Sequence, residues 1–288
     1  MKKIGVMSMV LIMLIGGGFF VRQALGHSLS IGSWVWETNE IENVDALFTF
    51  FEAEQIDRIY LQIDQSRRYS DYQRFIQEAT EKEIEVFALD GGPDWVYTNE
   101  AKIFVRWVHS FNEVVEENER FVGIQLDIEP YLLPEWEENR EEIVRRFQDV
   151  ILDVKQEIPM ISLELAVPFW FVSIDYHNEF GKGDLGQWAV RNSDQVSVMT
   201  YRTELEGENG IFSLFDPFVE RAQRENRPIR LAIETMEIDD ESISFYFHSK
   251  ETFQQALATL LSHYEKDKTV TGIDIHHYKS HKELLLDK

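Results

Sequence analysis

From residue 29 onward, short runs rich in β-branched and aromatic residues alternate with longer stretches in which apolar residues recur at helical spacing. The short runs predict eight strands, at Ser30–Trp36, Arg58–Ile63, Glu85–Asp90, Val122–Glu129, Ser162–Val167, Gln195–Tyr201, Arg230–Glu234 and Gly272–His276. The longer stretches predict helices at about 44–55, 70–82, 99–118, 135–157, 183–192, 211–226 and 249–265, with a short tail after the eighth strand.

Alternating strands and helices predict an α/β fold with a parallel sheet. Eight units in about 260 residues favour a single (β/α)8 barrel, the TIM-barrel fold. The alternative is an open doubly wound sheet. Such sheets usually carry a G-x-G-x-x-G or Walker pattern after a strand, and this sequence has neither.

The predicted fourth strand indicates which residues face the barrel interior. Gln125, Asp127 and Glu129 alternate with branched apolar residues, and alternation of period two places the two sets on opposite faces. The helices cover the apolar face, so we expect the polar set to point inward, with Glu129 nearest the C-terminal mouth. The same parity predicts further inward residues on the other strands: Trp34, Trp36, Tyr60, Gln62, Asp64, Ala88, Asp90, Glu164, Ala166, Met199, Tyr201, Glu234, Asp274 and His276.

The mouth of the barrel is the expected active site, because barrel enzymes of this class build their sites at the C-terminal ends of the strands. Buried carboxylates cost several kcal/mol unless they are paired or used in function. A polar core whose groups satisfy one another, or a site that has lost its activity, is the alternative. The predicted ring at the mouth consists of Trp36, Asp64, Asp90, Glu129, Tyr201, Glu234 and His276.

The first 26 residues have the plan of a targeting segment. Lys2 and Lys3 precede an uncharged run over residues 4–21, Arg22 ends the run, and small residues stand at Ala24 and Gly26. The run predicts either a cleaved signal peptide or a retained membrane tether, with the barrel domain at 27–288. We therefore expect an extracellular protein, or a membrane-anchored one that faces outside.

Charge and composition narrow the classes of partner. The chain has 28 Lys and Arg against 52 Asp and Glu, a formal net charge of −24, which disfavours nucleic acid. It has no cysteine, which excludes disulfides, thiolate nucleophiles and a lipoprotein anchor. Adjacent strand residues point to opposite faces, so His276 and His277 do not predict a metal centre. We expect no cofactor, and the sequence leaves the oligomeric state open.

Asp127 and Glu129 are the strongest candidates for chemistry. Two carboxylates two residues apart on one strand face repel each other, which raises the pKa of one and suits it to act as a general acid. Glu129 is the outer of the two and could reach the oxygen of a leaving group. Asp127 lies deeper and could orient Glu129 or share its proton.

The stretch Phe121–Glu129 resembles the strand-four signature of family 18 glycoside hydrolases, the chitinase-like barrels. Gly123, Asp127 and Glu129 match the signature, and Met199 with Tyr201 is similar to the Met-x-Tyr of the family's sixth strand. The resemblance implies that Glu129 is the general acid, that Asp127 steadies the acetamido group of the substrate, and that Tyr201 donates a hydrogen bond to that group.

The chain also departs from this family at three positions. Val122 and Gln125 stand where the family usually has acidic residues, and His276 stands where it usually has the tryptophan beneath the sugar.

A second resemblance is to retaining glycosidases that carry their two carboxylates on strands four and seven. Glu129-Pro130 and Glu234-Thr235 fit it, whereas Ile128 stands where those enzymes have Asn. That resemblance implies Glu234 as the nucleophile. Retaining enzymes hold the two carboxyl groups about 5–5.5 Å apart and inverting ones about 6.5–9.5 Å apart, a distance that the sequence does not give.

Aromatic residues between predicted strands five and six indicate a platform for sugar rings or, alternatively, a hydrophobic cap. Together these patterns predict an exported glycoside hydrolase acting on a cell-surface or extracellular poly- or oligosaccharide. The alternative is a non-catalytic carbohydrate-binding or envelope-interaction protein on a degenerate barrel. The predicted catalytic residues are Glu129, Asp127, Glu234 and Tyr201. The predicted substrate-binding residues are Trp36, Asp64, Asp90, Gln125, Met199, Trp170 and His276.

Overall fold

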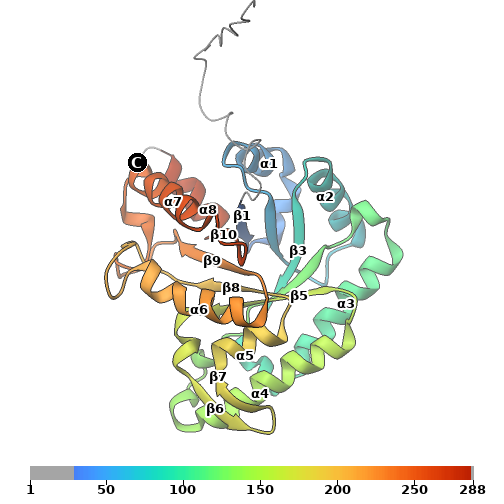
Figure 1. The fold of residues 1–288 in the computed structure, drawn as a ribbon. Coiled ribbons are helices and arrows are strands. Elements are labelled where there is room, and N and C mark those ends of the chain that lie inside the picture. Colours follow the sequence, from blue (N-terminus) through green and yellow to red (C-terminus); the bar gives the residue numbers. More distant parts are fainter. Residues whose placement is uncertain (1–28, 287–288) are drawn as a thin grey trace, which may run out of the picture.

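A computed structural model describes residues 29–286 of the chain. Eight parallel strands close into a barrel in the order β1-β10-β9-β8-β5-β4-β3-β2, and helices surround it (Figure 1). The barrel strands are β1 (Ser30–Val35), β2 (Arg58–Gln62), β3 (Glu85–Asp90), β4 (Gly123–Leu126), β5 (Ser162–Pro168), β8 (Gln195–Met199), β9 (Ile229–Glu234) and β10 (Val270–His276). The predicted (β/α)8 barrel is therefore confirmed.

Eight α-helices accompany these strands. They are α1 (Val44–Ala53), α2 (Tyr69–Glu81), α3 (Glu100–Val114), α4 (Trp136–Glu157), α5 (Leu185–Asn192), α6 (Ile211–Glu225), α7 (Lys250–Tyr264) and α8 (Tyr278–Leu285). Short 3-10 helices lie at η1 (Thr38–Glu42), η2 (Pro93–Tyr97), η3 (Glu117–Glu119), η4 (Pro130–Leu132), η5 (Phe169–Ser173) and η6 (Phe245–Phe247).

Three features differ from the sequence prediction. The segment after β10 is not a simple tail, because it forms α8 and completes the ring of helices. The connection between β5 and α5 contains an antiparallel hairpin of β6 (Asp175–Asn178) and β7 (Gly181–Asp184). Strands β4 and β8 end earlier than predicted, so Asp127, Glu129 and Tyr201 lie just beyond their strands, in the loops of the barrel mouth.

The predicted targeting segment over residues 1–26 lies outside the described residues. Within residues 29–286, no helix combines the length and the apolar character that crossing a membrane requires.

Apolar side chains fill the middle of the barrel. Trp34, Tyr60, Phe87, Leu89 and Ala232 form one buried cluster there, separate from the large core between the strands and the helices. The parity predicted for the third strand was wrong by one residue. Phe87 and Leu89 belong to the inner cluster, whereas Ala88 belongs to the outer core.

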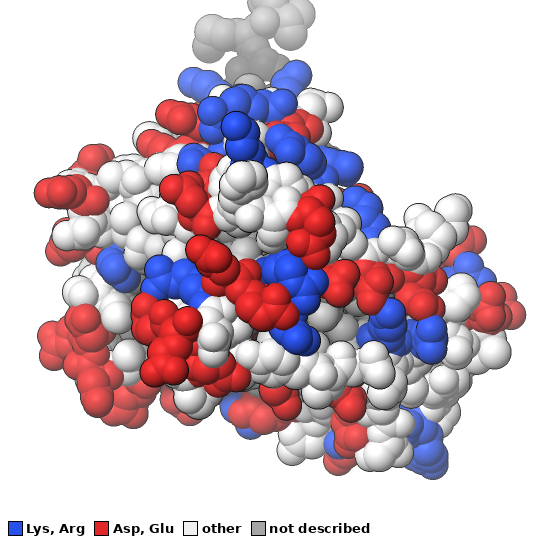
Figure 2. Space-filling view, turned by 90° about the horizontal axis from the view of Figure 1, so that it is seen from below, with Lys and Arg blue, Asp and Glu red and all other residues white. Residues whose placement is uncertain are grey.

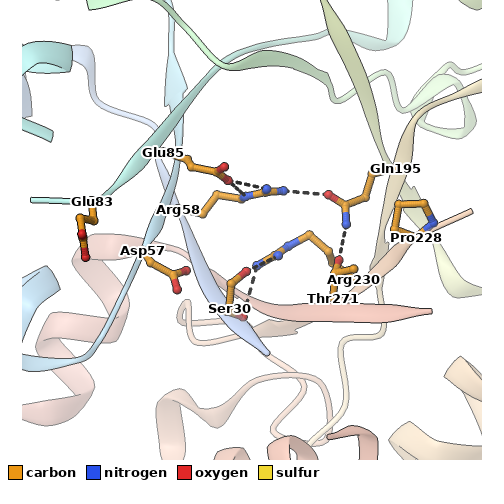
Figure 3. A pocket seen from close by; sticks show the side chains of 9 residues that line it. All are labelled: Ser30, Asp57, Arg58, Glu83, Glu85, Gln195, Pro228, Arg230 and Thr271. Atoms are coloured by element: carbon orange, nitrogen blue, oxygen red, sulfur yellow. Dashed lines mark hydrogen bonds and ion pairs between the residues drawn. The ribbon is translucent and has the colours of Figure 1, made fainter. Parts of the chain in front are cut away.

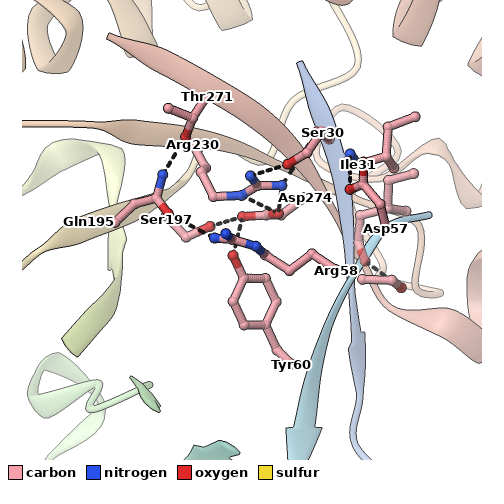
Figure 4. Close-up of polar contacts among 12 residues, drawn as sticks. Ser30, Ile31, Asp57, Arg58, Tyr60, Gln195, Ser197, Arg230, Thr271 and Asp274 are labelled. Atoms are coloured by element: carbon pink, nitrogen blue, oxygen red, sulfur yellow. Dashed lines mark hydrogen bonds and ion pairs between the residues drawn. The ribbon is translucent and has the colours of Figure 1, made fainter. Parts of the chain in front are cut away.

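Two arginines fill the end of the barrel where the strands begin (Figure 4). Arg230 on β9 pairs with Asp274 on β10, with Nη2 2.7 Å from Oδ1. Arg58 on β2 pairs with Glu164 on β5 at 2.8 Å, and the hydroxyl of Tyr60, with one proton to share, lies 3.1 Å from Oε2 of Glu164 and 3.3 Å from Oδ2 of Asp274. These contacts satisfy charges that would otherwise be costly to bury.

Glycine makes room for this network. A Cβ atom at Gly272 would lie 2.3 Å from Nη1 of Arg230, and one at Gly32 would lie 2.1 Å from Oδ1 of Asp274. Both glycines pair with the strand that carries these side chains, Gly272 with Arg230 and Gly32 with Asp274. Any larger residue at either position would displace the ion pair.

Acidic and basic side chains are intermixed on the face that Figure 2 shows. Exposed pairs include Arg106 with Glu157 at 2.7 Å and Lys82 with Glu52 at 2.6 Å. Such pairs contribute little stability individually.

Candidate active site

The loop that follows β4 places Asp127 and Glu129 at the mouth of the barrel. The amide of Asp127 donates to the carbonyl of Asp90 at 3.1 Å, which holds the end of β3 against this loop. Gly91 permits that approach, because a Cβ atom there would lie 2.1 Å from the carbonyl oxygen of Asp127. The backbone contact with the end of β3 therefore fixes the position of Asp127, although this residue lies just beyond β4.

The two carboxylates differ in their surroundings. Oδ1 of Asp127 is buried and has no hydrogen-bond partner among the described residues. Burial, and then the charge of Glu129, raise the pKa of the Asp127 carboxyl well above its ordinary value. Glu129 is partly buried, and its Oε1 accepts a hydrogen bond from the hydroxyl of Tyr131. The pair can therefore hold a proton that a solvent-exposed carboxylate would release.

Glu234 and His276, the last residues of β9 and β10, lie side by side at the mouth, because these neighbouring strands pair in register. Nδ1 of His276 lies 2.8 Å from Oε2 of Glu234, and Oε1 of Glu234 also accepts from the amides of Thr235 and Met236. The indole of Trp36 donates to Nε2 of His276 at 2.8 Å. Three of the predicted mouth residues thus form one hydrogen-bonded chain.

Tyr201 interacts with both the Asp127–Glu129 pair and the Glu234–His276 pair. Its ring lies 5.8 Å from the ring of His276. Burial raises the pKa of the Tyr201 hydroxyl, and the charges of Glu234, Asp127 and Glu129 raise it further. Tyr201 therefore remains a neutral hydrogen-bond donor. Met199, two residues earlier at the end of β8, is buried.

Gln125 lies below Asp127 and is fully buried. Its Oε1 accepts from the indole of Trp34 at 2.7 Å, and its Nε2 has no partner among the described residues. The amide therefore ties the floor of the site to the inner aromatic cluster, where an acidic residue would have placed a further charge beneath Asp127.

The side chains of Asp64 and Asp90 have hydrogen-bond partners outside the Asp127–Glu129 pair. Asp64 is exposed, and its Oδ1 accepts from the amide and the hydroxyl of Ser66, so it caps its own turn. Asp90 is half-buried and accepts from Nε2 of Gln62 at 2.9 Å.

Trp170 on η5 packs edge-on against Tyr131, with ring centroids 4.8 Å apart. Trp170 is half-buried and also contacts the ring of Trp136. It is therefore one residue removed from Glu129, through the tyrosine that donates to that carboxylate.

Sequence reasoning missed two residues of this site. Tyr131 is not among the predicted site residues, although its position two residues after Glu129 could have suggested that contact. Gly91 carries no chemistry, and only the close approach of two backbones reveals its role.

A cavity of about 520 Å³ lies at the opposite end of the barrel (Figure 3). It is lined by the first residues of several strands, among them Ser30, Arg58, Glu85 and Gln195. Its two arginines are held by neighbouring side chains, as described above. Among residues 29–286, no cluster of three or more His, Asp or Glu side chains is placed to hold a metal ion.

Comparison with known proteins places this architecture. No protein-family model matches the chain, and no curated protein matches it. Solved structures do match. The class V chitinase from Nicotiana tobaccum has a TM-score of 0.55 at 10% identity, over 91% of this chain and 99% of the chitinase.

Two further structures resemble it to a similar degree. A family 18 chitinase from Cycas revoluta in complex with (GlcNAc)3 has a TM-score of 0.51 at 13% identity, over 87% of this chain and 95% of that one. The intracellular xylanase TsXylA from Thermoanaerobacterium saccharolyticum has a TM-score of 0.56 at 7% identity, over 87% and 86%.

The chain therefore has the fold of family 18 chitinases and other glycoside hydrolase barrels, and the resemblance drawn from its sequence is confirmed at the level of fold. Identities of this size establish the fold alone, and the same fold serves many chemistries.

Proposed function

We propose that this chain is a glycoside hydrolase that cleaves glycosidic bonds in a poly- or oligosaccharide, with Glu129 as its general acid. The observation that carries the proposal is the Asp127–Glu129 pair at the mouth, one carboxylate with a buried unpaired oxygen and the other held by Tyr131. Glycosidases need a carboxylic acid that keeps its proton, and the pair supplies one, because burial and the charge of Glu129 raise the pKa of Asp127.

In the mechanism that fits these residues, Glu129 protonates the glycosidic oxygen as its bond to the anomeric carbon breaks. The acetamido oxygen of the substrate forms a bond to the same carbon, as in substrate-assisted enzymes. Asp127 and Tyr201 hold the acetamido group. Glu129 then takes a proton from the water that opens the intermediate, which returns the acid to its starting state.

The ligands bound in similar structures favour one class of substrate. Chitinases are the neighbours in which oligomers of GlcNAc are bound, so a polymer containing N-acetylated sugars is the first candidate. A basic start and an apolar run over residues 4–21 support export or a membrane tether, with the barrel acting on a cell-surface or extracellular polysaccharide.

One second function has a specific observation in its favour. Gln125 replaces an acidic residue below Asp127, and His276 replaces the tryptophan expected beneath the sugar. Both changes fit a protein that binds carbohydrate without cleaving it.

The test is release of reducing ends by the full chain from chitin oligomers, peptidoglycan, and deacetylated and neutral β-glucans. Glu129→Gln is the key variant, and Glu138→Gln, an exposed change of equal charge on α4, is the control. We expect activity that Glu129→Gln abolishes and Glu138→Gln preserves. Activity that survives Glu129→Gln would overturn the assigned acid. Binding of an oligosaccharide without turnover would support the second function.

A further inference from the structure

The chain of hydrogen bonds from Trp36 through His276 to Glu234 has only one arrangement of protons. An indole nitrogen can donate but cannot accept, so Nε2 of His276, 2.8 Å from the indole of Trp36, must be the acceptor. A neutral imidazole carries its proton on the other nitrogen, so Nδ1 donates to Glu234. The structure thereby sets the tautomer of His276.

Glu234 is committed to contacts within the protein. Its side chain is 2% exposed. Oε1 accepts from the amides of Thr235 at 2.8 Å and Met236 at 2.7 Å, and Oε2 faces Nδ1 of His276. A nucleophile needs an oxygen directed at the anomeric carbon, and here His276 stands in front of Oε2.

His276 in turn is surrounded by aromatic rings. The rings of Trp36, Trp34 and Tyr201 lie 5.9, 5.6 and 5.8 Å from its own. Since Trp36 occupies Nε2, the imidazole presents carbon edges and a ring face to its neighbours. Such a wall suits the C–H face of a pyranose ring.

We propose that Glu234 is a positioning residue, which fixes the tautomer of His276 and thereby holds the indole of Trp36 as a wall of the sugar-binding site. This inference rests on the proposed function, and it assigns to Glu234 a role other than that of nucleophile. His276 supplies a ring at the position where the resembling family has tryptophan, and the carboxylate of Glu234 keeps that ring in one orientation.

The substitution Glu234→Gln separates the two roles. Glutamine has one acceptor oxygen, so it keeps the hydrogen bond from Nδ1 of His276 only by turning its NH2 group towards the amides of Thr235 and Met236, and it cannot act as a nucleophile. In hydrolysis of the tetramer of GlcNAc, we expect Glu234→Gln to keep kcat within about ten-fold of the unsubstituted chain. Glu234→Ala should raise KM by roughly ten-fold or more while kcat changes less.

A control variant and a double-mutant cycle of Glu234 and His276 complete the kinetic test. Glu241→Gln, an exposed change of equal charge beyond β9, should leave both constants unchanged. His276→Phe keeps a ring but removes the acceptor of Trp36, and it should weaken binding as much as Glu234→Ala does. Because the two residues act in series, the double variant should be no weaker than His276→Phe alone. Equal and complete loss in Glu234→Gln and Glu234→Ala, with azide restoring the alanine variant, would establish a nucleophile and overturn the proposal.

A spectroscopic measurement tests the tautomer of His276 and does not require that the protein hydrolyse a glycan. In protein labelled with ¹⁵N-histidine, the ring nitrogens of His276, assigned with His276→Phe, should show the proton on Nδ1 in the unsubstituted chain. Glu234→Ala should give a mixture of tautomers. A proton on Nε2 in the unsubstituted chain would overturn the positioning role. If no glycan is cleaved or bound, the proposed function fails, and the tautomer still decides the role of Glu234 in the structure.

Discussion

Arg230 and Asp274 form an ion pair inside the barrel, with Nη2 and Oδ1 2.7 Å apart and side chains 1% and 0% exposed. The pair lies on adjacent strands, and its remaining polar atoms are also bound. Arg230 reaches the hydroxyl of Ser30, and Asp274 accepts from Ser197 and Tyr60. The interior of the barrel therefore has an ionic layer at one end, an aromatic layer in the middle and the candidate site at the other end.

Removing one partner of this pair should be costly. Arg230→Met leaves the carboxylate of Asp274 buried without its main counter-charge, and we expect the free energy of unfolding to fall by about 3–5 kcal/mol. Urea denaturation measures the change. Arg227→Met, which breaks a half-exposed pair with Asp194, should cost less than about 1 kcal/mol. Similar losses in the two variants would mean that the interior pair is not desolvated.

His281 on α8 should limit stability in acid. Burial lowers its pKa to about 3, and neither ring nitrogen has a partner among the described residues. Below the ordinary value of about 6.5 the unfolded chain binds a proton that the folded chain cannot, so stability falls as the pH decreases from that value towards 3.

The substitution His281→Leu tests this. It retains packing against Phe50 and Phe253 and removes the buried nitrogens. We expect it to stabilise the chain more at pH 5 than at pH 8, by a difference of roughly 2 kcal/mol in the free energy of unfolding. His109→Leu, at an exposed position, should show no such dependence. An equal effect of His281→Leu at both pH values would contradict the prediction.

The carboxylate pair should shape the pH dependence of hydrolysis. Because burial and the charge of Glu129 raise the pKa of Asp127, the pair keeps one proton to higher pH than an isolated carboxyl would. Asp127→Asn removes one charge from the pair. We expect kcat to fall by about 100-fold and the basic limb of the pH–rate profile to move to lower pH. An unmoved basic limb would show that Asp127 does not share the proton.

Gly91 should matter to activity through the backbone of Asp127. In Gly91→Ala, the new Cβ atom would lie 2.1 Å from the carbonyl oxygen of Asp127, so the loop after β4 must shift. A displacement of about 1 Å at a catalytic group can cost about 100-fold in rate. We expect kcat to fall by roughly that factor in a chain that still folds, as followed by circular dichroism. Retention of full kcat would show that the site tolerates the shift.

Much of this protein follows from local patterns in its sequence. The alternation of strand and helix signals predicted the barrel, because each unit is recorded in about 30 consecutive residues. The period-two pattern after Gly123 predicted that Asp127 and Glu129 lie together at the mouth, because two residues so close in sequence stay close in space. The same pattern failed on β3. There, Val86 to Leu89 are all apolar and set no parity, so the register with β2 and β4 decided that Phe87 and Leu89 point inward.

The partners of the charged residues were decided only by the tertiary structure. Glu234 meets His276 and Arg230 meets Asp274 across more than 40 residues of sequence, because β9 and β10 lie side by side in register. The side chain of Asp64 accepts hydrogen bonds within its own loop, from the amide and the hydroxyl of Ser66. A sequence shows which side chains can ionise. Whether a carboxylate is buried, paired or left without a partner depends on neighbours that only the closed barrel brings within hydrogen-bonding distance.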